Sequence, residues 1–572
     1  MTSTTALANP ADTPTIEGYP ALSREAAGAL KLVWRLSNIS DDWTKGGRIH
    51  DAWDRWTYWP YMAKVTYNLT FAVRMIAKIA QEVPAWREVC AEAAAKITER
   101  MNHYVSIYDW VEQKGLDPNR ANYPYFYYMH TMPPGTGGWY NAPGYAGNGL
   151  PVTMAGFFQS IMLAPVQPNP VHPYTYPHSP GVGRSYDPDP VRAHGSSNMM
   201  YKGYYIDQLA CNLAISGDRA RWEAPFEIVY DDELRWTYTA DQISAVLNEQ
   251  FQSPTDPGGS MMMYGIDCEV GKVFPLCVGV AGLGQRLWDR LQNTNHGEGF
   301  AKWLEFAKTW VFGGNATPED PYTWGTVYYD RDLNVATNLP QHDMPCFWTT
   351  VAYNSTPYGS EWSAKILRDC IAKFGRWEDG ALRLVHSPHI AGPMILDDQW
   401  GQTFAMATAY ELGDMDTYAA LRAYIDRAWQ PIHADGEFAY HFNLGEAWPR
   451  GIINHIQGFS LTGGAGSTAR LYNEPNVAKF GQPTLSGVDY PNLTVRQAWF
   501  DAAAKTLAVA VAPGRDASPV GAPTTLRVSN LCAPRARVVL DGVETDAWTQ
   551  PGEREIVVET TVGAHTLLVT PA

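Results

Sequence analysis

The chain of 572 residues is long enough to form one large domain together with a smaller one. Hydrophobic residues make up 45% of the sequence and charged residues 18%, which is typical of a well-packed globular protein. The formal net charge of −16 argues against nucleic acid as a partner, because phosphate binding needs clustered lysine and arginine side chains.

Three further features of the sequence concern the compartment of the protein. The N-terminal segment has neither the basic region nor the apolar stretch of a secretory signal. No stretch approaches the roughly 18 uninterrupted apolar residues that a membrane span needs. The seven cysteines are scattered and form no disulfide framework. We therefore expect a cytoplasmic protein with free thiols and no membrane span.

The N-terminal part is predicted to be helical after a flexible lead at residues 1–22. Apolar residues recur at helical spacing from Ser23 to about residue 112, and the clearest helix follows Pro60. Residues 115–190 form a long insertion rich in proline, glycine and tyrosine. A lid, an arm that contacts another subunit of a homo-oligomer, and a decorated surface loop are all compatible with this composition.

Helical patterns then resume in pairs that are separated by turn-rich connections. They cover residues 198–217, 239–252, 277–293, 297–311, 360–374, 400–412 and 415–430. Many helices with long loops at alternate junctions favour an α/α toroid over a simple bundle. We therefore predict one mainly α domain over residues 23–490.

The C-terminal part has a different spacing of apolar residues. From about Thr494, short runs of alternating apolar residues are punctuated by proline, glycine and aspartate. This pattern predicts a small antiparallel β-sandwich over residues 491–572, packed on the helical domain as an accessory unit.

The most informative motif comprises Cys268, Glu269, Phe274 and Cys277, directly before an apolar helical pattern. The nine-residue spacing of the cysteines is not that of a zinc site, and no paired histidines follow. An ordinary thiol has a pKa near ~8.5, so a modest shift lets one thiol donate a proton and another accept one. The competing interpretation is that both cysteines are core residues, since free cysteine is often buried.

A second cluster opens the helix predicted from residue 198. Tyr201 and Tyr204 carry hydroxyl groups that could bind a substrate oxygen, and Met200 could line an apolar pocket. The same residues suit the core-facing start of a helix equally well.

A third cluster precedes Pro60 and contains Asp41, Asp42 and Trp43. A buried carboxylate at this place could hold a substrate hydroxyl group or act as a base. An exposed one would simply belong to a solvated loop.

A fourth set places acidic residues beside aromatic ones, with Asp343 near Trp348 and Asp398 beside Trp400. Two carboxylates on the loops of an α/α toroid are what a glycosidase would use. The sequence contains no glycine-rich phosphate loop and neither of the common hydrolase motifs GxSxG and HExxH.

These motifs together resemble the linalool dehydratase-isomerase family. The cysteine segment matches its Cys-Glu-x7-Cys pattern with an aromatic residue at Phe274, and residues 198–203 match its Asn-x-Met-Tyr-Lys-Gly helix start. Tyr67 fits its early helix. Tyr204 stands where the family has a catalytic histidine, and the family's upstream aspartate and tyrosine correspond loosely to Asp41 or Asp42 and to Trp43.

The resemblance implies an (α/α)6 barrel with a pocket for an alkenol and with no metal or cofactor. It implies that Cys268 and Cys277 form the acid/base pair, supported by Glu269, with Asp41, Asp42 or Tyr204 assisting. The residues implied to line the pocket are Phe274, Met200, Tyr201, Tyr67, Trp43 and Trp348.

The leading hypothesis is thus a dehydratase or isomerase of a small hydrophobic alcohol, either an alkenol or a terpenoid alcohol. The alternative is a carbohydrate-active α/α-toroid enzyme of the glycoside hydrolase kind that uses Asp343 and Asp398. A third possibility is a binding protein without catalysis, whose aromatic insertion holds a hydrophobic ligand.

Overall fold

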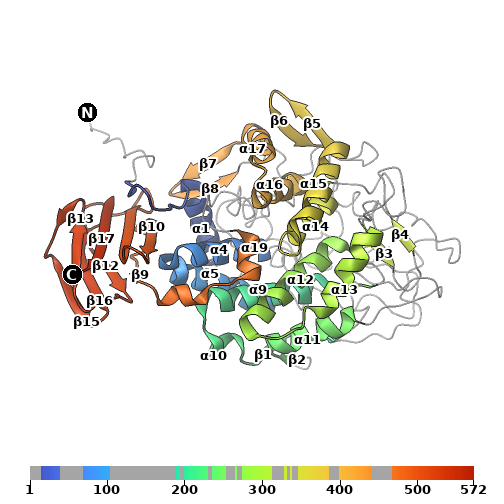
Figure 1. The fold of residues 1–572 in the computed structure, drawn as a ribbon, viewed down its shortest axis with the longest axis horizontal. Coiled ribbons are helices and arrows are strands. Elements are labelled where there is room, and N and C mark those ends of the chain that lie inside the picture. The colour runs from blue at the N-terminus through green and yellow to red at the C-terminus, as the bar shows by residue number, and fades with distance from the viewer. Residues whose placement is uncertain are drawn as a thin grey trace, which may run out of the picture.

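The computed structural model describes residues 14–38, 69–102, 189–192, 199–229, 235–252, 264–266, 273–311, 328–330, 335–337, 345–385, 399–440 and 467–572. These ranges are mainly helical with small antiparallel sheets, which confirms the predicted fold class at this level (Figure 1). None of the described helices is long and apolar enough to cross a membrane.

Most α-helices of the described ranges agree closely with the helical patterns of the sequence, whereas those at residues 219–222, 345–355 and 468–473 were not predicted. The α-helices are α1 (Arg24–Ser37), α4 (Thr70–Glu82), α5 (Arg87–Arg100), α9 (Met199–Ser216), α10 (Arg219–Trp222), α11 (Ala240–Phe251), α12 (Pro275–Gln292), α13 (Glu298–Phe306), α14 (Pro345–Ser355), α15 (Ser360–Phe374), α16 (Gln399–Leu412), α17 (Met415–Trp429) and α19 (Thr468–Asn473). The helix predicted directly after Pro60, over residues 61–77, is described only from residue 69 on, where it coincides with the start of α4. The insertion at 115–190 lies outside the described residues, apart from Asp189 and Pro190.

Local sequence signals explain where several helices begin and end. Thr239 and Gln242 form a capping box at the start of α11, and Asp414 caps α17 by accepting from the backbone of Thr417. Pro275 occupies the first position of α12, and Asn293 ends that helix in the left-handed conformation. The ends of these helices are thus set by residues next to them in the sequence.

The inward-facing helices contact one another in a circuit whose last link is a contact between two aromatic rings. α9 packs against α4 and α12, α12 packs against α14, and α14 packs against α16. The circuit closes where the rings of Phe71 on α4 and Phe404 on α16 meet, with centroids 4.9 Å apart. α5, α15 and α17 cover the outside of α9, α14 and α16 respectively.

Short β-hairpins connect several of these helices. They are β1 (Phe226–Val229) with β2 (Arg235–Tyr238), β3 (Tyr328–Asp330) with β4 (Val335–Thr337), β5 (Gly375–Glu378) with β6 (Ala381–Leu384), and β7 (Pro431–Ala434) with β8 (Glu437–Tyr440). The turns of the last two contain Asp379-Gly380 and Asp435-Gly436, all four with positive φ. Asp-Gly is a preferred pair for such turns.

The C-terminal residues form two antiparallel sheets at one end of the molecule, next to α1, α4 and α5 (Figure 1). The five-stranded sheet has the order β10 (Leu493–Asp501), β11 (Thr506–Pro513), β17 (His565–Pro571), β13 (Ala536–Leu540), β14 (Val543–Glu544). The four-stranded sheet has the order β15 (Trp548–Gly552), β16 (Glu555–Thr561), β12 (Pro523–Ser529), β9 (Thr484–Ser486).

The N-terminal segment is held against strand β10. The side chain of Gln497 accepts from the backbone N–H of Ile16 at 2.7 Å and donates to the carbonyl oxygen of Tyr19 at 2.8 Å. α1 then packs on β8, where Arg35 Nε donates to the Glu437 carboxylate at 2.5 Å. Residues from both ends of the described chain are therefore part of one packed structure.

Two glycines allow α9 and α12 to approach closely. A Cβ atom on Gly284 would lie 2.6 Å from the backbone nitrogen of Asp207, and one on Gly203 would lie 2.8 Å from the Cβ of Ala281. Both distances are far below a van der Waals contact, so a larger residue cannot be accommodated without moving a helix.

Gly284→Ala is therefore expected to lower the free energy of unfolding by about 1–3 kcal/mol, because the added methyl group pushes α12 off the backbone of α9. The better helix propensity of alanine, about 1 kcal/mol, offsets part of this cost. Gly359→Ala is the control, since a Cβ there meets nothing within 4 Å and its φ of 164° is extended. Urea unfolding followed by circular dichroism makes the comparison, and equal midpoints would contradict the close contact.

Candidate active site at the helix N-termini

The predicted cysteine segment leads into the first turn of α12. Pro275 opens the helix, and Cys277 is buried in the first turn, with its backbone N–H donating to the carbonyl oxygen of Phe274 at 3.0 Å. The Phe274 ring lies 6.4 Å from the ring of Phe347, which belongs to the first turn of α14. Cys277 therefore lies at the end of two neighbouring helices where aromatic rings gather.

A second group of aromatic rings lies at the starts of α4, α9 and α16. The ring of Phe71 on α4 is 6.0 Å from that of Tyr204 and 4.9 Å from that of Phe404. All three side chains are buried. Phe71 belongs to the first turn of α4, whereas Tyr204 and Phe404 are the sixth residues of α9 and α16. The N-terminal parts of these helices thus present a buried aromatic layer at one end of the circuit.

Two other predicted pocket residues point away from this layer. Tyr201 packs its ring 5.6 Å from that of Tyr205, on the side of α9 that faces Met101. Trp348 packs on α15, with its ring 5.9 Å from that of Phe374. Three predicted pocket residues have described side chains: Phe274, Tyr201 and Trp348. Among these three, only Phe274 lies next to an aromatic ring in the first turn of a neighbouring helix.

The remaining predicted site residues cannot be placed. Cys268, Glu269, Asp41, Asp42, Trp43, Tyr67, Asp343 and Asp398 lie outside the described residues, and of Met200 only its place in α9 is described. Within the described ranges, no three His, Cys, Asp or Glu side chains come together as metal ligands would.

A buried charge network lies deeper between the same helices. Asp207 accepts from Arg74 Nε at 2.5 Å and from the hydroxyl of Tyr472 at 2.8 Å, and Arg74 Nη1 donates to Oδ1 of Asn354 at 2.8 Å. The Arg74 and Asp207 side chains are 0% exposed. Burial opposes the charge on Arg74, but the adjacent Asp207 outweighs this effect and raises the pKa of the guanidinium group.

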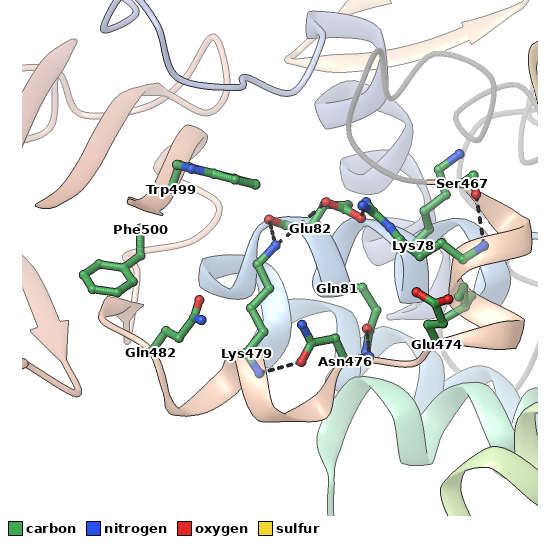
Figure 2. A pocket seen from close by; sticks show the side chains of 12 residues that line it. Lys78, Gln81, Glu82, Ser467, Glu474, Asn476, Lys479, Gln482, Trp499 and Phe500 are labelled. Carbon is green, nitrogen blue, oxygen red and sulfur yellow. Dashed lines mark hydrogen bonds and ion pairs between the residues drawn. The ribbon is translucent and has the colours of Figure 1, made fainter. Parts of the chain in front are cut away.

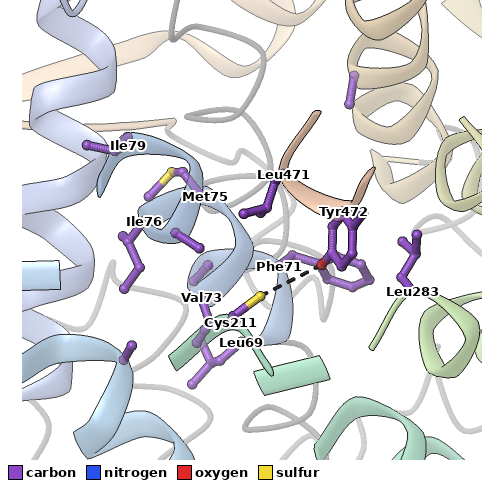
Figure 3. Close-up of a cluster of buried hydrophobic side chains, with 14 of the residues drawn as sticks. Leu69, Phe71, Val73, Met75, Ile76, Ile79, Cys211, Leu283, Leu471 and Tyr472 are labelled. Carbon is purple, nitrogen blue, oxygen red and sulfur yellow. Dashed lines mark hydrogen bonds between the residues drawn. The ribbon is translucent and has the colours of Figure 1, made fainter. Parts of the chain in front are cut away.

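Cys211 lies on the same face of α9, one turn beyond Asp207. Its Sγ is 3.8 Å from the hydroxyl of Tyr472, in the apolar surroundings that Figure 3 shows. Burial raises the pKa of the Cys211 thiol well above its usual range, and the nearby Asp207 adds to this shift. Cys211 is therefore a neutral thiol at physiological pH and a poor acid/base group.

The network continues along α4 to a second buried ion pair. Lys78 Nζ lies 3.5 Å from the carboxylate of Glu411, and both side chains are 1% exposed. Glu411 also accepts from the backbone N–H of Thr468 at 2.8 Å and from its hydroxyl at 2.7 Å. Burial lowers the pKa of Lys78, and Glu411 opposes that shift.

Two donors of the network have no acceptor among the described residues. They are Nη2 of Arg74 and Nδ2 of Asn354, and both atoms are buried. Buried donors of this kind are normally satisfied by ordered water or by a bound polar group. These two donors are therefore places in the interior of the helix circuit where an ordered water or a bound polar group would complete the hydrogen bonding.

Sequence reasoning missed this network, although one signal was present. α4 is buried along its whole length, yet it carries Arg74 and Lys78 four residues apart. Two cations on one face of a helix with no solvated side must both find buried partners, because an isolated buried charge is very costly. The pattern identifies an inward-facing polar face but does not identify the partners.

The comparison with solved structures gives only a weak similarity. A GH127 beta-L-arabinofuranosidase from Geobacillus stearothermophilus T6 matches with 9% identity and a TM-score of 0.23, over 95% of this chain and 75% of that chain. At this TM-score the match supports no statement about fold or function. No curated protein matches the chain.

The comparison with family models is informative. The model of the linalool dehydratase/isomerase family matches residues 179–444, which run from before α9 to just beyond β8. The matched region includes the Cys268–Cys277 segment and the helix starts that carry Tyr204 and Phe347. Over residues 179–444, somewhat less than half of its length, the chain is therefore similar to the linalool dehydratase/isomerase family.

Proposed function

We propose that this protein is a dehydratase or isomerase of an alkenol or terpenoid alcohol in which Cys268 and Cys277 carry the acid/base steps. The match of residues 179–444 to the family model supports linalool dehydratase/isomerase-like chemistry in general. The observation that supports the finer assignment is the place of Cys277, buried in the first turn of α12 beside the Phe274–Phe347 ring pair.

The chemistry follows from the poor leaving ability of hydroxide. One thiol donates a proton to the departing hydroxyl group, which leaves as water, and positive charge develops on carbon. The other cysteine, as a thiolate, removes a proton from the adjacent carbon, and that electron pair forms the new double bond. If water instead adds to the cation at another carbon and loses a proton to the thiolate, the product is the isomerised alcohol. Proton exchange between the two thiols then restores the starting state, with Glu269 as the group placed next to Cys268 in sequence.

Two features of the site suit this reaction. Aromatic faces stabilise nearby positive charge, and a water-poor pocket keeps a carbocation-like species from being quenched. A thiolate at residue 277 would lie at the N-terminal end of α12, where the helix dipole stabilises negative charge.

We further propose that the helices of residues 23–490 close into an (α/α)6 barrel, with residues 491–572 as an accessory β-sandwich. The circuit through α4, α9, α12, α14 and α16, with α5, α15 and α17 packed outside α9, α14 and α16, supports this arrangement. In such a barrel the five helix starts would open into one pocket.

The test is a gas-chromatographic product screen. Purified, reduced protein is incubated without added metal with a panel of short alkenols and monoterpene alcohols, and Cys268→Ala is run in parallel. The expected result is an alkene or rearranged alcohol that disappears in the variant. Products that persist in Cys268→Ala would overturn the thiol mechanism, and the absence of product from the wild-type protein across the panel would overturn the proposed substrate class.

A further inference from the structure

Three buried polar atoms on α4 and α14 lack a hydrogen-bond partner among the described residues. They are Nη2 of Arg74, Nδ2 of Asn354 and Oγ1 of Thr350. Arg74 and Thr350 are 0% exposed, and Asn354 is 1% exposed. Buried polar groups are normally paired, because an unpaired one is costly in a low-dielectric interior. Three such atoms facing one space indicate a place where a small polar molecule binds.

The hydrogen bond between Arg74 and Asn354 crosses the interior of the circuit and brings two of these atoms together. Arg74 Nη1 donates to Oδ1 of Asn354 at 2.8 Å, and Nε of Arg74 donates to Asp207 at 2.5 Å. A guanidinium group has only donors, so it holds the amide with its oxygen toward Arg74. Nη2 shares a carbon atom with Nη1, and Nδ2 shares one with Oδ1. Both therefore lie beside this hydrogen bond, where one small acceptor can reach them.

Thr350 lies one turn before Asn354 on the same face of α14. Side chains four residues apart on a helix have Cβ atoms ~5–6 Å apart. An oxygen atom at ~2.8–3.0 Å from each polar group therefore fits between them. The neighbouring Thr349 turns to a different side, where its hydroxyl donates to the carbonyl oxygen of Pro345 at 3.0 Å. Thr350 thus adds an acceptor to the two donors.

Helix α12 leaves room for Asn354 and places Cys277 at the same height. A Cβ atom on Gly279 would lie 3.1 Å from the Cβ of Asn354 and 3.5 Å from its Nδ2. The ring contact at their first turns indicates that α12 and α14 run in the same direction. Cys277 lies two residues before Gly279, or roughly 3 Å along the axis. Its level along the circuit is therefore between those of Thr350 and Asn354.

The surroundings of these groups favour a small neutral ligand. Asp207 already balances the charge of Arg74, and both side chains are 0% exposed. Two N–H donors do not suit a cation, and the Asp207 carboxylate disfavours a second anion beside it. The guanidinium group lies 5.1 Å from the centre of the Phe71 ring and 5.6 Å from that of the Tyr472 ring. A water molecule, with two lone pairs and O–H donors, completes this set.

The other end of α4 carries no comparable set. A pocket of about 330 Å³ lies there, between α4, α19 and the C-terminal sheets (Figure 2). Its cations Arg470 and Lys479 both contact the Glu82 carboxylate. None of the described side chains that line it has a buried polar atom without a partner. Among the described side chains of α4, only that of Arg74 has such an atom.

We propose that Arg74, Asn354 and Thr350 hold the water molecule that leaves the substrate, and that they bias the reaction toward the alkene. The water accepts from Nη2 of Arg74 and Nδ2 of Asn354 and donates to Oγ1 of Thr350. Both of its lone pairs are then occupied, so it cannot add to the carbocation without losing a hydrogen bond. In the absence of substrate a water from solvent takes the same place. The inference rests on the proposed function, since the leaving water is a product of that reaction.

The first measurement is a high-resolution crystal structure of the full-length protein. An ordered oxygen atom is expected within hydrogen-bond distance of Nη2 of Arg74, Nδ2 of Asn354 and Oγ1 of Thr350. This result needs no turnover, so it tests the site independently of the proposed function. If the electron density at this place contains no oxygen atom, the inference is wrong.

The second measurement is the ratio of rearranged alcohol to alkene formed from the best substrate of the product screen. Thr350→Val keeps the shape of the side chain but removes the acceptor, so the water is held less firmly. The ratio is expected to rise by about three- to tenfold, which is the effect of one hydrogen bond. Thr349→Val is the matched control, because it removes a buried hydroxyl from another side of α14, and its ratio should not change. Thr350→Ser keeps the hydroxyl and should keep the wild-type ratio.

Equal ratios in Thr350→Val and Thr349→Val would overturn the role of the water while leaving the proposed function in place. If the wild-type protein forms no product, the proposed function and this role both fail, and the crystal structure alone decides on the binding site. Thermal melts show whether each variant is folded. If Thr350→Val does not fold, Thr350→Ala takes its place, and a ratio equal to that of the wild-type protein would contradict the proposal.

Discussion

Turnover by Cys277→Ala is expected to fall by about 10²–10⁴-fold, because the proposed mechanism loses one of its two proton-transfer groups and general acid/base catalysis has this magnitude. The substitution removes a buried sulfur from the first turn of α12 and leaves the Phe274–Phe347 ring pair in place. The substrate should therefore still bind. Steady-state kinetics on the best substrate of the product screen should show the loss in kcat with a small change in KM.

Cys370→Ala is the control for the loss of a buried thiol, since Cys370 is buried on α15, which packs outside α14. Its kcat is expected to stay near that of the wild-type protein. If both variants lose activity equally, the effect reflects packing, and the assignment of Cys277 to the chemistry is wrong. If Cys277→Ala keeps full activity, the proposed acid/base pair is excluded.

Arg74→Met is expected to destabilise the protein by about 3–5 kcal/mol, because it leaves the buried Asp207 carboxylate without its cation. Tyr472 still donates to Asp207, but one hydrogen bond does not compensate a buried charge. The same substitution leaves the carbonyl oxygen of the Asn354 side chain without its donor. The measurement is the midpoint of urea unfolding, with the slope checked for two-state behaviour.

Two further variants sharpen this experiment. Arg537→Met breaks an ion pair with Glu544 in which both side chains are more than half exposed, so the cost should stay below about 1 kcal/mol. Arg74→Met combined with Asp207→Leu removes both buried charges and should recover part of the stability lost in the single variant. If Arg74→Met is no less stable than Arg537→Met, the Arg74–Asp207 pair does not form.

Much of the helical framework could be predicted from spacing alone. Patterns at 360–374 and 415–430 match α15 and α17 almost residue for residue, because outer helices have one apolar and one polar face. α14 was not predicted as a helix, since all eleven of its residues are buried. A helix that is covered on every side has no amphipathic period to detect.

The hairpins were missed for a different reason. β5–β6 and β7–β8 are strands of four residues each, too short to show an alternating pattern. Their Asp-Gly pairs at 379–380 and 435–436 are turn signals that could have revealed them.

The candidate site could be predicted only in part. The first turn of α12, with Phe274 and Cys277, lies where the motif placed it. Tyr472 could not be connected with Asp207 from the sequence, because 265 residues separate them and a single sequence carries no pairing information. The outward orientation of Tyr201 and Trp348 depends on helix rotation within the tertiary fold, which residue type alone does not determine.

The attachment of the N-terminal segment to strand β10 has a consequence for synthesis. Ile16 finds its partner Gln497 only after 481 further residues have been translated, and the partner of Arg35 on β8 follows it by 402. At ~5–20 residues per second, the first delay is roughly 25–100 s. During that time α1 can already pack on α5, but the surface that it presents to β8 and β10 has no partner from those strands. Residues 16–35 are thus translated long before the strands that hold them.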